Sequence, residues 1–171
     1  MQSEKSVGFD SFTAFIQEYK ADAKEKGAAE YYHVNVVVDA FNRGKEVGKE
    51  EGLDDYLKEV LMRKIELFQS KANQIYILSR KVVGDIKEQN FTACSLHINV
   101  NPSRPNVVIS VPETALLQDK FIDSIYNNIA IYKKIYFELF EEMLDIGLMP
   151  MENIDFESLK EEGYDYHESF S

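Results

Sequence analysis

The sequence predicts an α+β fold that is mostly helical, with long helices packed on one antiparallel β-hairpin. Apolar residues recur every three or four positions across residues 53–89 and again across 119–146, which indicates two long helices. Residues 96–101 and 106–111 alternate apolar and polar side chains, which indicates the hairpin. We expect the order α-α-α-β-β-α and a short helix after Asp155. The predicted organisation is one domain over residues 1–149, followed by an acidic tail with aromatic residues over 150–171.

The first helix is expected to begin at Asp10 or Ser11 and to end near Gly27, because aspartate and serine cap helix starts and glycine often ends helices. Residues 28–51 fit two structures. Residues 31–38 have the β-branched and aromatic composition of a strand. As a helix, the same segment forms one apolar stripe and continues into a charged stretch, so we favour the helix.

The third helix, residues 53–89, is opened by Asp54 or Asp55. Its apolar residues step by three or four throughout, as a helix with one buried face requires. They are Leu57, Leu61, Ile65, Phe68, Ala72, Ile75, Leu78, Val82 and Ile86.

The register of the hairpin follows from its alternation. Pairing Asn101 with Asn106 across Pro102-Ser103-Arg104-Pro105 places all the alternating apolar residues on one face. These are Leu96, Ile98, Val100, Val107, Ile109 and Val111. The other face carries His97, Asn99, Asn101, Asn106, Val108 and Ser110. Because a two-stranded sheet is marginal alone, the long helices are expected to cover its apolar face.

The edges of the hairpin also need partners. A third strand near residues 148–154 would supply one. Pairing between the hairpins of two subunits would supply another, and we favour this dimer because two-fold pairing is a common way to satisfy an edge.

The last long helix is expected from about Asp119 to Ile146, with Gly147 as its stop and Pro150 just beyond. Its apolar stripe is broader than a coiled-coil seam, so we expect it to face the core, with a helical dimer seam as the alternative. The stripe is Ile122, Ile125, Ile129, Tyr132, Tyr136, Leu139, Met143 and Ile146.

Composition narrows the function classes. The net charge of −11 argues against direct binding to nucleic acid or to an anionic membrane, where negative groups dominate affinity. Residues 150–171 hold seven acids and one base, a net of −6, beside four aromatic residues. That segment is either a solvated tail or one that docks on a partner or on its own domain. A single cysteine, Cys94, and an N-terminus without a signal-peptide pattern lead us to expect a cytoplasmic protein.

Three motifs have the residue types of chemical sites. Glu30 and His33 have the spacing of a helical metal motif, but one copy is what chance provides, so we expect no metal and no cofactor. Cys94 and His97 suggest a nucleophile and a base, but strand alternation points them to opposite faces, so we expect no catalytic residues. Gly44, Gly48 and Gly52 either open a close-packing face or break the helix before Asp54.

We therefore expect a non-enzymatic protein-interaction module, such as an adaptor, an acidic chaperone or an inhibitor, that binds another protein or itself as a homodimer. The candidate interaction surface is His97, Asn99, Asn101, Arg104, Ser110, Phe156, Tyr164 and Tyr166. The alternative is a small-molecule-binding protein or small enzyme with a pocket between helices. Its candidate lining is Tyr32, His33, Tyr132 and Tyr136.

Overall fold

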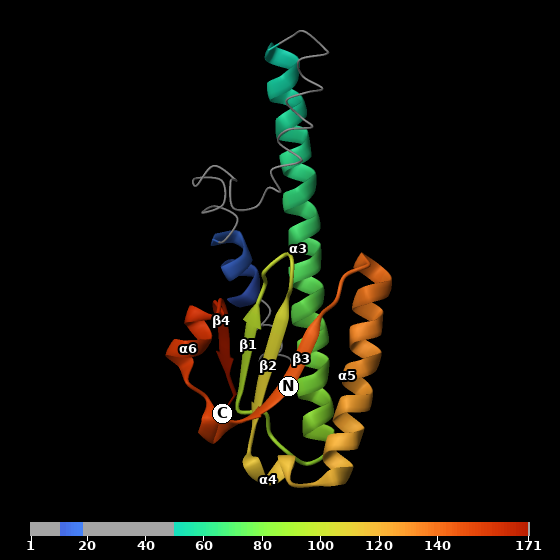
Figure 1. Cartoon of the computed structure of the whole chain (residues 1–171), viewed down its shortest axis with the longest axis vertical. Coiled ribbons are helices and arrows are strands. Elements are labelled where there is room, and N and C mark those ends of the chain that lie inside the picture. The colour runs from blue at the N-terminus through green and yellow to red at the C-terminus, as the bar shows by residue number, and fades with distance from the viewer. Residues whose placement is uncertain (1–10, 19–49, 171) are drawn as a thin grey trace. The chain divides into compact units, whose positions relative to one another are not determined.

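The computed structural model describes residues 11–18 and 50–170 (Figure 1). The chain divides into two compact units, Met1–Ser70 and Lys71–Ser171, and the boundary falls inside one helix. In the first unit, residues 11–18 are helical, as predicted, and Phe12 and Ile16 are buried. The expected end of that helix near Gly27 and the choice between helix and strand at 31–38 lie outside the described residues.

The predicted third helix is confirmed as α3, Glu50–Glu88, but its predicted start is wrong. Asp54 and Asp55 lie inside the helix and do not open it, and Gly52 does not break it. In the second unit this helix buries the apolar positions that its spacing predicts, which are Ala72, Ile75, Leu78, Val82 and Ile86. A helix of this length is stabilised mainly by packing of that face, because helix propensity alone contributes little per residue.

The α+β class is confirmed, but the hairpin is the middle of a larger sheet. Strands β1 (Ser95–Asn99) and β2 (Asn106–Val111) pair antiparallel. Strand β3 (Asp145–Pro150) lies parallel to β2, and β4 (Tyr166–Ser169) lies antiparallel to β1, giving a four-stranded sheet of order β3-β2-β1-β4. Both edges of the hairpin are thus paired within the chain. The alternative of a third strand is the one that the structure supports, since β3 pairs with β2. Pairing of hairpins between two subunits is not needed to cover this edge of the hairpin.

The predicted faces of the hairpin are confirmed, although the predicted register is wrong by two residues. Asn99, not Asn101, lies opposite Asn106. The connection is longer because asparagine side chains curl it: Asn101 N–H donates to Asn99 Oδ1 over 2.8 Å, and Ser103 N–H donates to Asn101 Oδ1 over 2.9 Å. A shift of two residues keeps every side chain on its face, so all six predicted apolar residues are buried.

The last long helix is shorter than predicted. After the short helix α4 (Glu113–Leu116), α5 runs from Asp119, the predicted start, only to Phe140. Glu141 adopts a left-handed conformation, φ 55°, and its N–H donates to the carbonyl of Phe137, which ends the helix. Ile146, predicted as helical, lies in β3. The stretch from β2 to β3 is therefore a helical crossover between parallel strands.

Residues 150–171, expected to form a tail, include ordered elements of the second unit. The 3-10 helix η1 (Met151–Asn153) follows β3, and α6 (Phe156–Glu161) confirms the predicted short helix after Asp155. Strand β4 then forms an edge of the sheet. This segment joins the fold because Tyr166 and Glu168 alternate with His167 and Ser169, as a strand requires.

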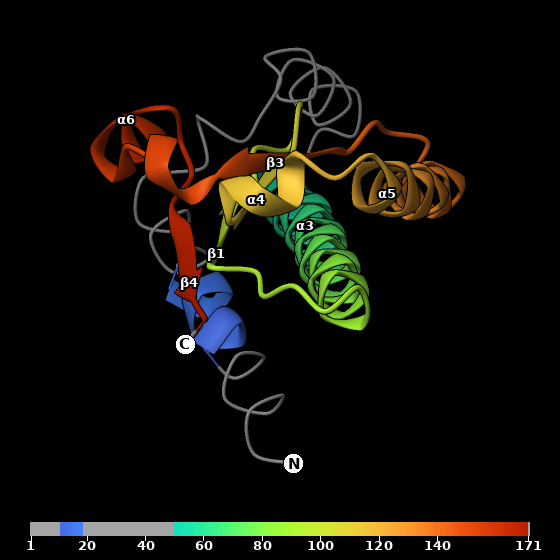
Figure 2. The same ribbon diagram turned by 90° about the horizontal axis from the view of Figure 1, so that it is seen from below.

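Within the second unit, the sheet has a different cover on each face. Figure 2 shows α5 and this unit's part of α3 on one face, and α6 toward the other. The helix-covered face carries the buried residues Leu96, Ile98, Val107 and Ile109. The opposite face carries His97, with the Phe156 ring of α6 against it.

Candidate functional site

A cluster of serine and histidine side chains lies on the face of the sheet that α6 covers. Ser95 Oγ is 2.9 Å from His97 Nε2 and 2.6 Å from Ser110 Oγ. His97 stacks on His167 of β4, with ring centroids 4.8 Å apart. The neighbours β1, β2 and β4 position this cluster, because their residues 95, 110 and 167 point to the same face.

Burial decides what this cluster can do. Burial, and secondarily the nearby His167, lower the pKa of His97 to about 4, so its imidazole is neutral at neutral pH. A serine hydroxyl beside a neutral imidazole resembles a nucleophile and its base. Ser95 is 1% exposed and His97 is 2% exposed, so a substrate reaches neither while the cover is in place. The arrangement is therefore best explained as a satisfied internal network.

Cys94 does not pair with His97 as a nucleophile with its base. Its thiol sulfur is 3.9 Å from the carbonyl oxygen of Thr92. Burial, with a smaller effect of Glu152, raises the thiol pKa, which keeps the sulfur protonated and weakly nucleophilic.

The structure separates the residues of the predicted interaction surface. His97, Ser110 and Tyr166 are buried. Asn99 donates to the carbonyl of Glu162 and Tyr164 is partly buried, so both take part in internal packing. The exposed members are Asn101, Arg104 and Phe156.

The two described residues of the predicted pocket lining also have internal roles. Tyr136 is buried and packs on Phe140, with ring centroids 4.9 Å apart. The Tyr132 hydroxyl donates to Asp85 of α3 over 2.8 Å, and burial raises its pKa to about 12. Tyr32 and His33 lie outside the described residues, as does the Glu30–His33 motif.

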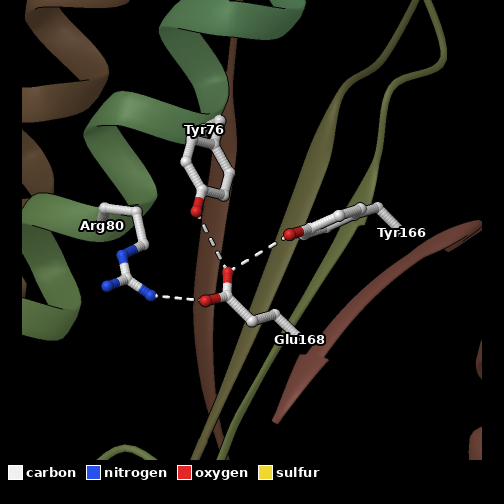
Figure 3. A network of polar contacts seen from close by, with 4 residues as sticks. All are labelled: Tyr76, Arg80, Tyr166 and Glu168. Carbon is white, nitrogen blue, oxygen red and sulfur yellow. Dashed lines mark hydrogen bonds and ion pairs between the residues drawn. The ribbon is translucent and has the colours of Figure 1, made fainter. Parts of the chain in front are cut away.

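A second polar network, which the sequence did not predict, joins β4 to α3 (Figure 3). Arg80 Nη1 donates to Glu168 Oε1 over 2.7 Å, and the hydroxyls of Tyr76 and Tyr166 donate to Oε2 over 3.2 and 3.3 Å. Burial, then the Glu168 carboxylate, raise the pKa of Tyr76 far above its usual range, so its hydroxyl stays a donor. The Arg80 guanidinium also lies 5.1 Å from the Phe170 ring centroid.

Helix α5 also presents a row of exposed side chains that a partner can reach. Positions spaced by three, four or seven residues form one row along a helix, and every member of one such row on α5 is exposed. This outer row is Asp119, Asp123, Tyr126, Ala130 and Phe137, together with Glu141, the residue that caps the end of α5. Tyr126 is 42% exposed and Phe137 is 48% exposed. The sequence signal was present as aromatic residues outside the predicted core stripe, but exposure cannot be read from spacing alone.

Within residues 11–18 and 50–170, no three His, Cys, Asp or Glu side chains gather closely enough to hold a metal ion. None of the helices in those ranges combines the length and the apolar character needed to cross a bilayer.

The chain was compared with protein-family models, curated proteins and solved structures, and none of the three comparisons gives a match. Function is therefore inferred from the residues themselves.

Proposed function

We propose that the chain is a non-enzymatic, cytoplasmic protein-interaction module, and that it binds another protein through the outer row of α5. The observation that carries this proposal is the partial exposure of two aromatic side chains, Tyr126 and Phe137, on a helix that its buried residues anchor in the core. Aromatic residues are enriched in the buried centres of protein interfaces.

The row has the shape of a contact surface. Tyr126 and Phe137 are eleven positions apart, so their Cα atoms lie about 16 Å apart along the axis. Ala130 lies between them on the same row, and its small side chain lets a partner approach the helix between the two rings. Two large anchors around a small residue suit the packing of a partner's apolar side chains.

Charge and composition support the rest of the proposal. The net charge of −11 opposes contact with phosphate groups, which favours a protein partner over nucleic acid. The single cysteine, Cys94, is free and fits a reducing compartment such as the cytoplasm.

The test is affinity purification of the tagged full chain, with two matched double variants. Tyr126→Ser with Phe137→Ser removes the two rings of the outer row. Leu117→Ser with Ile131→Ser removes two other exposed apolar side chains, at the end of α4 and on another side of α5. Circular dichroism and thermal melting show that each variant is folded.

We expect a partner that the wild type and the Leu117/Ile131 variant retain and that the Tyr126/Phe137 variant loses. The proposal is wrong if the Tyr126/Phe137 variant retains the same proteins as the wild type, or if the wild type retains nothing beyond an untagged sample.

A further inference from the structure

In the part of the chain that the structure describes, the outer edge of β3 has no strand beside it. Strand β3 is the last strand of the sheet on its side, and no described residue pairs with its outer edge. Asp145 N–H donates to the carbonyl of Pro105, on the β2 side, over 3.1 Å. Because successive residues of a strand point their N–H and C=O groups to opposite sides, Ile146 and Leu148 direct theirs outward. These two residues offer two donors and two acceptors to an incoming strand.

This edge also lacks the usual protection. Charged side chains and prolines discourage strand pairing, and β3 has them only at its ends, as Asp145 and Pro150. The four residues between them, 146–149, carry no charge. At the other side of the sheet, β4 carries the inward-pointing Glu168, a recognised protection of an edge strand. The two edges are therefore not equivalent.

The outer row of α5 adjoins this open edge. Helix α5 packs on β3, and Figure 2 shows it beside that end of the sheet. Lys133 lies three residues from Ala130 and four from Phe137, on the flank of the same row. Its Nζ is 3.0 Å from Asp145 Oδ1 at the start of β3. A strand added to β3 would therefore turn alternate side chains toward the flank that carries Tyr126 and Phe137.

The charges of the row indicate what such a strand carries. Lys133 and Lys134, the bases next to the row, are already paired with Asp145 and Glu138. The acids at the two ends of the row, Asp119 with Asp123 and Glu141, form no ion pair with any described residue. Lys120 is also unpaired among the described residues, but it lies on a different side of the helix, six positions before Tyr126. The unbalanced charge of the row is thus negative at both ends, with aromatic rings between.

We infer that β3 accepts an extended segment of a partner protein by strand addition, and that this segment has an apolar centre flanked by lysine or arginine. The distance from Asp123 to Glu141 along the helix is about 27 Å, which an extended segment of about eight residues spans. Main-chain hydrogen bonds to Ile146 and Leu148 would hold the segment, and the aromatic rings would select its apolar side chains. This inference rests on the proposed function and adds the class of partner and its binding mode.

The experiment compares Leu148→Pro with Leu148→Ala in the full chain. Both variants remove the leucine side chain, but only proline removes the outward N–H, and its ring blocks an incoming strand. Pairing of β3 with β2 uses the residues on either side, so it is retained. The probe is a fluorescent peptide with a valine–threonine alternating centre and two lysines at each end. A peptide with the same centre and glutamates at both ends is its control.

We expect the lysine-flanked peptide to bind the wild type and Leu148→Ala, and to bind Leu148→Pro with an affinity lower by roughly tenfold or more. We expect the glutamate-flanked peptide not to bind. Equal binding to the two Leu148 variants would overturn strand addition, because nonspecific attraction to an acidic protein does not depend on one N–H. Circular dichroism of Leu148→Pro confirms that the fold is intact.

Further results separate strand addition by a partner from self-association and from failure of the proposed function. If light scattering shows a dimer that Leu148→Pro converts to a monomer, a second copy of the chain occupies the edge. The inference that a segment of a different protein binds there is then wrong. If the Tyr126/Phe137 variant loses a partner that Leu148→Pro keeps, strand addition fails while the proposed function stands. If no partner depends on the outer row, the proposed function itself fails.

Discussion

At the scale of the residue, substitution by alanine is expected to have opposite effects on the free energy of unfolding at two glycines. Gly163 has φ of 91°, and a Cβ there would lie 3.0 Å from Asn99 Nδ2, the group that bonds the Glu162 carbonyl. Gly84 lies on the exposed side of α3, and a Cβ added there would meet nothing within 4 Å. We expect Gly163→Ala to lower the free energy of unfolding by about 1–2 kcal/mol. Gly84→Ala should raise it by about 0.5–1 kcal/mol.

Urea denaturation of the two variants beside the wild type checks both values. If Gly163→Ala does not lower the free energy of unfolding, the positive φ and the contact with Asn99 do not constrain this position. If Gly84→Ala does not raise it, helix propensity does not decide the effect at that position.

Glu168 is the residue with the largest expected electrostatic effect. Its carboxylate is largely buried and is the counter-charge of Arg80, whose side chain is 24% exposed. Glu168→Gln keeps the shape and an acceptor but leaves the guanidinium without a negative partner, so we expect the free energy of unfolding to fall by about 1–3 kcal/mol. Glu161→Gln removes the same charge from an exposed position of α6 and serves as the control. Equal effects of the two variants in urea denaturation would contradict a specific role for the network.

Residue faces could be predicted from the sequence, whereas residue partners could not. Alternation alone placed Leu96, Ile98 and Val107 in the core, because the period of a strand fixes its faces. The contact of Arg80 with Glu168 joins positions 88 apart in the chain. It depends on β4 pairing with β1, which no local pattern specifies.

At the scale of the element, α6 depends on its N-cap residue, Asp155, which directly precedes the helix. The Asp155 carboxylate accepts hydrogen bonds from the N–H groups of Glu157 and Ser158 and from the Ser158 hydroxyl, at 3.0, 3.2 and 2.9 Å. These bonds, chiefly those from Ser158, lower the pKa of Asp155. We expect Asp155→Ala to speed hydrogen exchange of the first α6 amides, while Asp155→Asn, which still caps, should leave it close to that of the wild type. Unchanged exchange in Asp155→Ala would show that tertiary contacts alone hold this helix.

The start of the last long helix could be predicted from the sequence, but its end could not. The start of α5 at Asp119 could be predicted, but the apolar spacing continued through Met143 and Ile146 after the helix had ended. The left-handed residue that ends the helix is Glu141, not a glycine, so composition gave no signal. The same spacing then placed Ile146 in a helix, whereas it lies in β3, where pairing with β2 outweighs the weak local preference.

At the scale of the whole molecule, the sheet couples overall stability to pH through His97. Its pKa of about 4 lies below the ordinary 6.5 that it has in the unfolded chain. Between these two values the unfolded chain binds more protons than the folded one, so acidification favours unfolding. The main cause is burial, and the second is His167, which stacks on His97 from β4. Protonation of His97 therefore opposes the pairing of β4 and the cover by α6 together.

We expect the free energy of unfolding to fall by roughly 3 kcal/mol as the pH drops from 6.5 to 4, and to stay constant with respect to this group below pH 4 and above pH 6.5. Carboxyl groups in general also take up protons as the pH approaches 4, so the measured quantity is the difference between the wild type and His97→Gln in urea denaturation at each pH. His97→Gln should be less stable at pH 8, because it loses the ring stack, yet lose less stability on acidification. His167→Gln should keep most of the fall, since burial of His97 remains. If His97→Gln and the wild type lose stability in parallel between pH 6.5 and 4, the buried imidazole is not the group that links folding to protons.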